Sequence, residues 1–293
     1  MSAESGIPSR LTITDGTKFK LTDFRTDDRI GHDKKSAHTR IRDCVDRMAI
    51  LQGRLAAHGS HGILVVLQGM DTAGKDGAIR HAFSGLNPQG FHVTSFKTPA
   101  GAAEKRDDLW RVHLMAPARG EIAVFNRSHY EDVLIARVHP DIVRARGLNP
   151  DEPGFWDRRL ADIRHFESYL THQNVIILKL FLHISADEQK KRILKRLTQP
   201  EKRWKFSPSD LAEREKWPDY TKAYEAAIQA TSTPEAPWHI IPADHKWAAR
   251  LMVAEALLET MEKLHLKVPE EKLSDTLRAA RDALLAEGSF RTQ

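Results

Sequence analysis

The stretch LVVLQGMDTAGKDGAI, residues 64–79, limits what this chain can fold into more than any other part of it. An apolar run at 63–67, typical of a buried strand, leads into a glycine-rich turn and a segment that can be helical. Within the turn, Gly69, Gly74 and Lys75 match the pattern G-x-x-x-x-G-K. Backbone N–H groups in such a loop surround phosphate oxygens, while the helix N-terminus and the lysine add positive charge. The stretch therefore predicts a phosphate-binding strand–loop–helix unit, with an ordinary glycine-rich turn as the alternative.

Two acidic residues distinguish this loop from the usual pattern. The eighth position normally carries a serine or threonine that contacts Mg²⁺, but here it is Asp76, and a second acid, Asp71, lies inside the loop. A carboxylate beside bound phosphate is unfavourable unless a cation lies between the two. Asp71 is therefore predicted to be a ligand of Mg²⁺, which Mn²⁺ can replace.

Composition narrows the class of partner. The chain has 293 residues and a formal net charge of +5, which favours anionic partners, although simple solubility explains it equally well. Its single cysteine, Cys44, allows no intrachain disulfide, so we expect a cytoplasmic protein. The N-terminal residues lack the pattern of a signal peptide, and no apolar run approaches transmembrane length, so we expect no membrane contact.

The order of predicted elements indicates an α/β fold. Apolar spacing predicts strands and helices that alternate along the chain, which is typical of a mostly parallel sheet with helices on both faces. The expected architecture is three-layered, with a five-stranded sheet. Strands are predicted at 63–67, 91–96, 121–125, 175–184 and 238–241. Helices are predicted at 34–58, after the glycine-rich turn, and at 102–115, 155–170, 186–197, 219–230 and 243–264, with 134–143 helical or irregular.

Three units follow from this order. Residues 1–33 are polar and rich in turn formers, so we expect a loose N-terminal arm that drapes over the domain. Residues 34–264 would form the main domain. Residues 265–293 would form a helical extension, with a last helix at 272–286 packed on the outside.

A second polar cluster follows the predicted strand at 121–125. Ligands of parallel sheets bind beyond the carboxyl ends of the strands, which is where this cluster lies. Acidic side chains there can hold Mg²⁺, and the guanidinium of Arg127 can grip two phosphate oxygens at once. The alternative is a surface ion pair between Arg127 and Glu131. The cluster consists of Asn126, Arg127, Ser128, Tyr130, Glu131 and Asp132.

A third cluster is strongly basic. Ser185 is a predicted N-cap, completed by Glu188 in a capping box, and a basic helix follows it. Because the helix starts at the ligand-binding edge of the sheet, residues 186–218 are predicted to form a lid that closes over phosphates, with a solvated basic face as the alternative. Trp204 and Phe206 would either stack on a nucleobase or anchor the lid. The cations are Lys190, Lys191, Arg192, Lys195, Arg196, Lys202, Arg203 and Lys205.

The motifs together resemble the polyphosphate kinase 2 family over residues 18–263. The stretches that carry the resemblance are GMDTAGKDG, NPQGFHVTSFKTP, DDLWRVH, FNRSHYEDV, IRHFE, KKRILKRL, EKRWKF and APWHIIPADHKW. The resemblance implies a thymidylate-kinase-like P-loop kinase fold with a helical lid. It also implies Mg²⁺-dependent transfer of phosphoryl groups between inorganic polyphosphate and nucleotides. We further expect a homo-oligomer, either a dimer or a tetramer, and no nucleic-acid partner.

The resemblance also implies roles for single residues. Asp71 would orient the metal and the acceptor phosphate, and Lys75 would bind the transferring group. Arg127 would clamp phosphate, and Arg192 would reach in from the lid. Metal ligands would be Asp71 and Glu131, with Asp132 a weaker candidate because family members vary there. The phosphate- and nucleotide-binding set would be Gly69, Ala73, Gly74, Lys75, Asp76, Gly77, Asn126, Arg127, Glu131, Lys191 and Lys195.

The acceptor is indicated by two positions. Members that act mainly on nucleoside diphosphates resemble Asp-Arg-Ser where this chain has Asn126-Arg127-Ser128, and they lack the acid at Glu131. The chain is instead similar to the single-domain subgroup that accepts both mono- and diphosphates, which implies AMP and ADP, and also GMP and GDP. The alternatives are an ATP-dependent nucleoside monophosphate kinase, which Asp71 and Asp76 weigh against, and a non-catalytic basic nucleic-acid-binding protein, which leaves the acidic loop unexplained.

Overall fold

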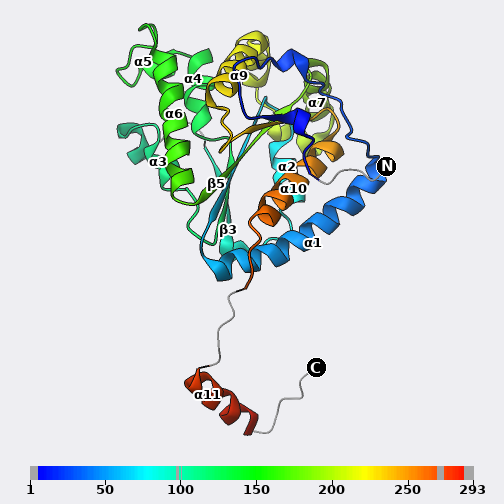
Figure 1. Ribbon diagram of the computed structural model, residues 1–293. Helices are drawn as coiled ribbons and strands as arrows, with labels where there is room; N and C mark the ends of the chain where they lie inside the picture. The colour runs from blue at the N-terminus through cyan, green and yellow to red at the C-terminus, as the bar shows by residue number, and fades with distance from the viewer. Residues whose placement is uncertain (1–5, 97–98, 100, 269–273, 287–293) are drawn as a thin grey trace.

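The computed structural model describes residues 6–96, 99, 101–268 and 274–286, and its centre is a six-stranded sheet (Figure 1). The strand order is β1-β6-β5-β2-β4-β3. All five predicted strands are present and pair in parallel. They are β2 (Gly62–Gly69), β3 (Phe91–Ser95), β4 (Ile122–Asn126), β5 (Val175–His183) and β6 (Trp238–Pro242).

The central strand β2 brings the two predicted polar clusters together. All eight of its residues are buried, as expected for a strand covered on both faces of a parallel sheet. It lies between β5 and β4, and Leu67 is in register with Asn126. The glycine-rich loop after β2 and the polar segment after β4 therefore leave the sheet side by side, at its carboxyl edge.

Helices cover both faces of the sheet (Figure 1). One face carries α1 (Lys34–His58), α2 (Lys75–Ala82) and α10 (Lys246–Lys263), which contact one another. The other carries α3 (Trp110–His113), α4 (Ile135–Val138), α5 (Asp141–Arg144), α6 (Phe155–His172) and α9 (Trp217–Thr231). The long helix α1 begins at a capping box, in which Asp33 accepts from Ser36 N and Ser36 accepts from Asp33 N. It ends at Gly59, in the left-handed conformation.

The prediction of one helix at 102–115 is wrong. The chain forms a 3₁₀ turn, η4 (Gly101–Lys105), and then the four-residue α3. Between them the Asp107 carboxylate accepts from Leu109 N at 3.0 Å. Such a local bond offers the backbone an alternative to the helical pattern, so the helix does not continue through this position. The segment at 134–143 is similarly divided into α4 and α5, with Pro140 between them.

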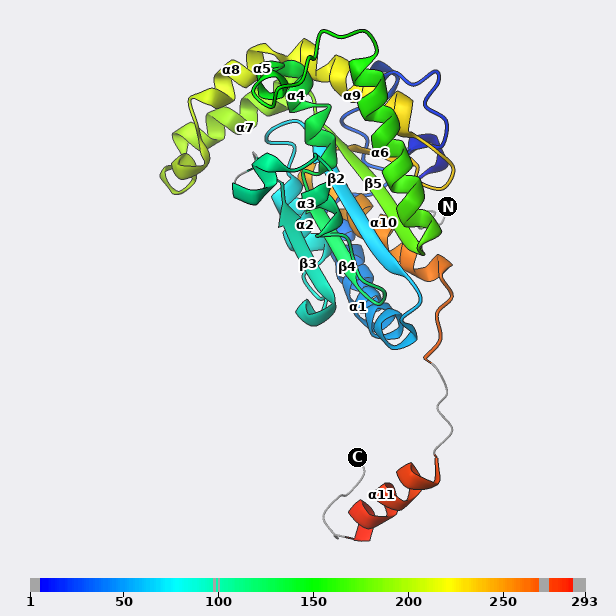
Figure 2. The same cartoon turned by 90° about the vertical axis from the view of Figure 1, so that its left-hand side faces the viewer.

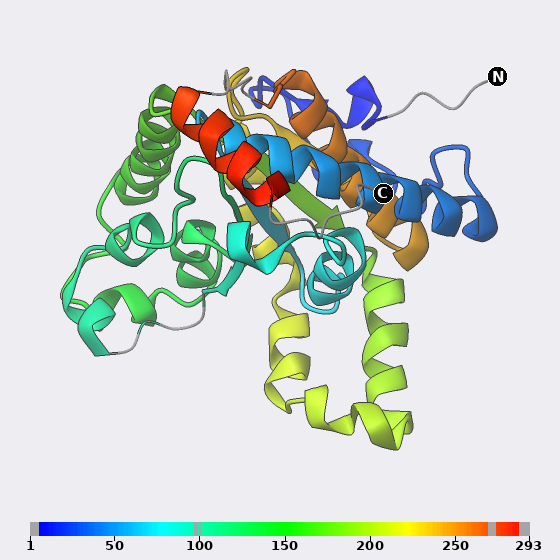
Figure 3. The ribbon, with the colours of Figure 1, turned by 90° about the horizontal axis from the view of Figure 1, so that it is seen from below.

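The lid consists of α7 (Ala186–Thr198), η6 (Pro200–Lys205) and α8 (Ser209–Glu215), and it projects from the sheet (Figures 2 and 3). Ser185 is the N-cap of α7, as predicted, since its Oγ accepts from Glu188 N at 3.1 Å. The reciprocal half of the predicted capping box is replaced by an ion pair. The Glu188 carboxylate accepts from Arg192 Nε at 2.8 Å instead.

The N-terminal segment is packed rather than loose. Its described part includes the short strand β1 (Thr12–Ile13), which pairs antiparallel with β6 and is the sixth strand of the sheet. Leu11, Phe19 and Leu21 are buried, and Leu21 N donates to Glu225 Oε1 at 2.8 Å. The few apolar residues of this polar segment thus pack into the core next to α9. Because they are widely spaced in the sequence, they form no periodic pattern that would have predicted this packing.

The last helix does not pack as expected. Every described residue of α11 (Asp275–Ala286) is exposed, and the helix lies apart from the rest of the chain (Figures 1 and 2).

No helix among the described residues has both the length and the apolar character needed to cross a bilayer.

The packed N-terminal segment gives a test by stability. Leu21→Ala should lower the free energy of unfolding by about 2–4 kcal/mol, because it removes a buried side chain and leaves a cavity. Denaturant unfolding followed by circular dichroism measures the change. The control is Thr22→Ala, at an exposed neighbour. Equal stability of the two variants would contradict the packing of this segment.

Candidate active site

Two glycines shape the loop between β2 and α2. Gly69 has φ 153°, and a Cβ there would lie 2.7 Å from the carbonyl oxygen of Leu182 on the neighbouring strand β5. Gly74 has φ 111° and precedes α2. A side chain at Gly69 would force the strand and the loop apart, and one at Gly74 would be strained. The glycines of the predicted pattern therefore occur where the backbone requires them.

Lys75 places a cation against the inner side of this loop. Its Nζ donates to Gly69 O at 2.6 Å and to Met70 O at 3.4 Å. Desolvation lowers the pKa of Lys75, and the nearby carboxylate of Asp71 opposes that effect. The ammonium group is held by carbonyl oxygens alone, so a phosphate oxygen is a better partner than those it has.

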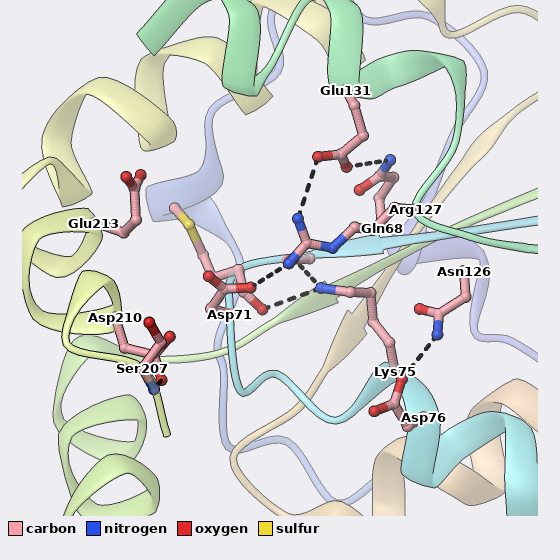
Figure 4. A network of polar contacts seen from close by, with 12 residues as sticks. Gln68, Asp71, Lys75, Asp76, Asn126, Arg127, Glu131, Ser207, Asp210 and Glu213 are labelled. Atoms are coloured by element: carbon pink, nitrogen blue, oxygen red, sulfur yellow. Dashed lines mark hydrogen bonds and ion pairs between the residues drawn. The ribbon is translucent and has the colours of Figure 1, made fainter. Parts of the chain in front are cut away.

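Arg127 lies between two carboxylates (Figure 4). Its Nη2 lies 2.8 Å from Asp71 Oδ1, and its Nη1 lies 3.5 Å from Glu131 Oε2. Gln68 Nε2 donates to Glu131 Oε1 and to Ser128 Oγ, both at 3.1 Å. Burial raises the pKa of Glu131, while Arg127 opposes the change. The guanidinium thus links the acid of the glycine-rich loop to the acid that follows β4.

The backbone of Arg127 is in an uncommon conformation. Its φ is 62°, in the left-handed region that glycine favours, directly after β4. Its N–H donates to Leu67 O at 3.2 Å, which closes the end of the sheet. Such strain persists only where the surroundings hold it, and it concentrates at functional sites.

The second acid of the loop contacts Asn126. The Asn126 Nδ2 donates to Asp76 Oδ1 at 2.8 Å. Two of the predicted site residues, from different elements, are therefore joined at the rim of the loop. An aspartate in place of Asn126 would put two carboxylates in contact.

The loop, α2, α10 and the lid enclose a cavity of about 760 Å³ with a strongly cationic lining. Low-dielectric walls lined by one sign of charge concentrate the opposite charge, so the cavity suits an extended polyanion. Its cations are Lys75, Arg80, Arg127, Arg192, Lys195, Arg196, Lys202, Lys246 and Arg250, and its acids are Asp71, Asp76 and Asp210.

Arg192 lines the cavity from the first helix of the lid, and its guanidinium is held by backbone carbonyl groups. It is 6% exposed, and it braces the base of the lid. Its Nη1 donates to the carbonyl oxygens of Thr72 and Ala73, and its Nη2 donates to those of Ala243 and Asp244, at 2.6–3.0 Å. Direct contact between this guanidinium and phosphate stays a prediction.

The other lid cations separate into two groups. Lys195 lines the cavity, as does Arg196, which pairs with Asp210 at 3.2 Å. Lys191 is exposed and does not line it. Trp204 is 78% exposed and is also absent from the lining.

The structure does not bring Asp132 together with Asp71. Asp132 is buried and lines a separate cavity beside α6, where Arg146 Nη1 lies 3.5 Å from its Oδ1. Burial raises its pKa to about 6. Its neighbour Glu131 instead faces Arg127.

A magnesium ion fits the remaining acids. The described residues contain no group of three or more acidic, histidine or cysteine side chains that could form an all-protein site. Mg²⁺ commonly binds one or two carboxylates and completes its shell with water and substrate phosphates. Asp71 has a side chain 40% exposed at the cavity, which suits such a ligand, and Glu131 lies across Arg127 from it.

Several cavity residues escaped the sequence analysis. Lys246 and Arg250 lie one turn apart near the start of α10, and Arg80 lies on α2. The position of α10 directly after β6, at the carboxyl edge of the sheet, was a usable signal for the first two. Gln68, which contacts Glu131 and Ser128 outside the cavity lining, could have been identified as a polar residue inside an apolar strand.

A family model described as polyphosphate kinase 2 matches residues 31–269. An ADP-polyphosphate phosphotransferase of Rhodopseudomonas palustris is 45% identical over 265 residues, 89% of this chain and 92% of that protein. An AMP/ADP-polyphosphate phosphotransferase of Meiothermus ruber is 46% identical over 255 residues, 86% of this chain and 92% of that protein.

A solved structure is similar along nearly the whole chain. The crystal structure of polyphosphate kinase 2 from Arthrobacter aurescens TC1 superposes with a TM-score of 0.87 at 40% identity, and the match covers 98% of both chains. The predicted P-loop kinase fold is confirmed by this likeness.

The cavity predicts a pH dependence of polyanion binding. The pKa of Lys246 is lowered to about 8, mainly by desolvation of its ammonium group and to a smaller extent by repulsion from Arg192, Arg250 and Lys195. An anion binds the protonated form more tightly, so affinity is retained below this pKa and is lost as the pH rises through it. If binding needs that charge, the Kd for tripolyphosphate should rise by about tenfold from pH 7 to pH 9.

The control variant is Lys246→Arg, which keeps its charge over this range. Isothermal titration calorimetry should give a much flatter profile for it than for the wild type. Parallel pH profiles of the two proteins would show that Lys246 does not contribute.

Proposed function

The chain belongs to the polyphosphate kinase 2 family, and we propose that it transfers the terminal phosphoryl group of inorganic polyphosphate to both AMP and ADP. The products are ADP and ATP, and the purine pair GMP and GDP would be accepted in the same way. The observation that carries this proposal is the cationic cavity built on the acid-bearing loop, with Arg127 between Asp71 and Glu131. Family membership speaks against the alternative of a non-catalytic protein.

Phosphoryl transfer depends mainly on in-line positioning and on neutralising charge, both of which this cavity can supply. Lys75 would move from the loop carbonyls to an oxygen of the transferring group. Arg127 would exchange a carboxylate for an acceptor phosphate oxygen. Because both cations are already at the loop, little reorganisation is needed when charge develops in the transition state.

Asp71 and Glu131 are the residues that would hold Mg²⁺. The ion, when bound, would neutralise phosphate oxygens and let the carboxylate of Asp71 lie near them. Released from Arg127, Asp71 would fix the cation at the point where donor and acceptor meet. Asp132, in its separate cavity, has no part in this arrangement.

The donor would lie along the cations of the lid and α10. Polyphosphate carries about one negative charge per phosphate unit, so several residues neutralise it along its length, and its affinity should fall steeply with salt. Lys195 and Lys202 of the lid line the same cavity as Lys246 and Arg250 of α10. These four residues support a chain-like donor rather than a compact one.

The acceptor pocket would tolerate one or two phosphates because of Asn126 and Glu131. Asn126 is neutral and donates a hydrogen bond to Asp76, so an additional acceptor phosphate meets less repulsion there than a second aspartate would cause. Glu131 could hold a cation or its water shell in the space that AMP leaves. The Meiothermus ruber relative, named for both AMP and ADP, supports this reading.

Three further features belong to the proposal. The divalent cation would be Mg²⁺, with Mn²⁺ as a substitute. The protein would act in the cytoplasm, in keeping with its single cysteine, and it would form a dimer or tetramer.

The proposal is tested by Glu131→Gln. The variant should slow AMP phosphorylation at least about tenfold more than ADP phosphorylation, because the shorter acceptor depends on Glu131 in addition to fill the vacant phosphate position. Chromatographic time courses with polyphosphate and Mg²⁺, without ATP, measure both reactions. Glu152→Gln, at an exposed ion pair with Arg158, is the control. Wild-type protein that leaves AMP unchanged, or a variant that loses both activities equally, would contradict dual acceptance.

A further inference from the structure

A buried polar cluster lies behind the segment that carries Arg127 and Glu131. At its centre Lys179 Nζ lies 2.6 Å from Glu167 Oε2, and the two side chains are 0% and 2% exposed. Lys179 also donates to Thr231 O at 2.7 Å. The pair joins the middle of β5 to α6 and to the last residue of α9.

The segment after β4 is attached to this cluster by two consecutive residues. Tyr130 donates its hydroxyl to Glu167 Oε1 at 2.8 Å, and His129 Nε2 lies 3.2 Å from the same oxygen. Since a carboxylate only accepts, His129 must carry its proton on Nε2. The Tyr130 hydroxyl also lies 2.8 Å from Thr231 Oγ1 and receives a bond from Lys179 at 3.3 Å. Both residues belong to η5 (His129–Asp132), the turn that includes Glu131.

Stability alone does not explain a charged pair at this position. Lys179 is the only ionisable residue between Val175 and Leu182 in an apolar strand, and burying an ion pair costs desolvation that its attraction rarely exceeds. Apolar residues of similar volume would serve the core at least as well. The pair does provide something apolar residues cannot, which is a fixed acceptor for the tyrosine and histidine of the turn.

The turn needs such a fixed point. Arg127 is held at φ 62°, and its neighbour Ser128 is bound by Gln68. From there the chain must direct Arg127 to the cavity, place Glu131 beside it, and direct His129 and Tyr130 to the core. Glu167 holds His129 and Tyr130, two of the three residues that lie between Arg127 and Glu131, so it determines where both of these site residues are placed.

We propose that Glu167 and Lys179, acting through Tyr130, are positioning residues of the transfer reaction that hold residues 127–131 in the conformation that presents Arg127 to the cavity with Glu131 paired to it. None of the three contacts the reacting groups. The proposal rests on the proposed function for its kinetic consequences, whereas its structural consequence, the order of the turn, is independent of any substrate.

The first test is Tyr130→Phe, which removes the hydroxyl and keeps the ring in the core. It should lower kcat about ten- to a hundredfold with little change in KM, because a small displacement of positioning groups is costly. Amide hydrogen exchange, followed by mass spectrometry, should become faster over residues 127–132. The control is Leu55→Ala, a buried change on α1, which should lower the Tm but keep kcat and the exchange of this turn.

A double-mutant cycle separates positioning from general destabilisation. In an Arg127→Ala background, Tyr130→Phe should lower kcat by a clearly smaller factor than in the wild type, because one of the two groups that it positions is gone. A merely structural role would give the same loss of kcat in both backgrounds.

The charged pair is tested by asking whether a double variant recovers activity that each single variant loses. Glu167→Gln leaves a buried, unpaired lysine, and Lys179→Met leaves a buried, unpaired carboxylate. Each single variant should therefore be inactive or unfolded. The double variant removes both charges and keeps an amide oxygen to accept from Tyr130 and His129. It should recover a folded protein with more activity than either single variant.

The proposal is overturned if Tyr130→Phe keeps wild-type kcat, or if it leaves the exchange of 127–132 unchanged. It is also overturned if Tyr130→Phe lowers kcat as much in the Arg127→Ala background as in the wild type. The same holds if the Glu167→Gln/Lys179→Met double variant folds but is as inactive as either single variant. Should the wild type show no polyphosphate-dependent transfer, the exchange measurement still decides whether this cluster orders the turn.

Discussion

The ion pairs of Arg127 are the interaction on which the rest of the site depends. One guanidinium contacts Asp71 from the loop after β2 and Glu131 from the turn after β4. Without it, the carboxylates of Asp71 and Glu131 would lack their ion-pair partner beside a cavity suited to phosphate. With it, each acid is paired in the ligand-free site, and the same cation can change partners when phosphate arrives. The site is therefore preorganised for anions although two of its members are acids.

The fold supports this arrangement at two levels. The parallel register of β2 and β4 brings the loop and the turn to the same edge of the sheet. The finer position of the turn depends on contacts made elsewhere, namely Gln68 in the sheet and Glu167 on α6. The lid contributes in two ways. Arg192 fastens the base of α7 to the glycine-rich loop, and Lys195 lines the cavity. Electrostatic attraction of a long anion and precise placement of its end thus come from separate parts of the chain.

Most of the architecture could be predicted from the sequence because it follows from short-range patterns. Apolar runs located all five parallel strands, and Gly69 and Gly74 marked a loop that only glycine permits. Long-range relations were less accessible. Leu21 is held through Glu225 of α9, 204 residues away in the chain, and the brace made by Arg192 depends on carbonyl groups of a folded loop. A lysine within an apolar strand signals a buried partner, but the sequence does not say that the partner is Glu167.

We infer that this cavity performs phosphoryl transfer with Lys75 as the cation on the moving group. This role is measured most directly by kcat for polyphosphate-dependent phosphorylation of ADP in Lys75→Met, a variant of similar shape without the charge. We expect a fall of about a hundredfold or more with unchanged circular dichroism, while Lys222→Met, at an exposed lysine of α9, keeps full activity. A folded Lys75→Met enzyme that retains half of the wild-type kcat would contradict this role of Lys75.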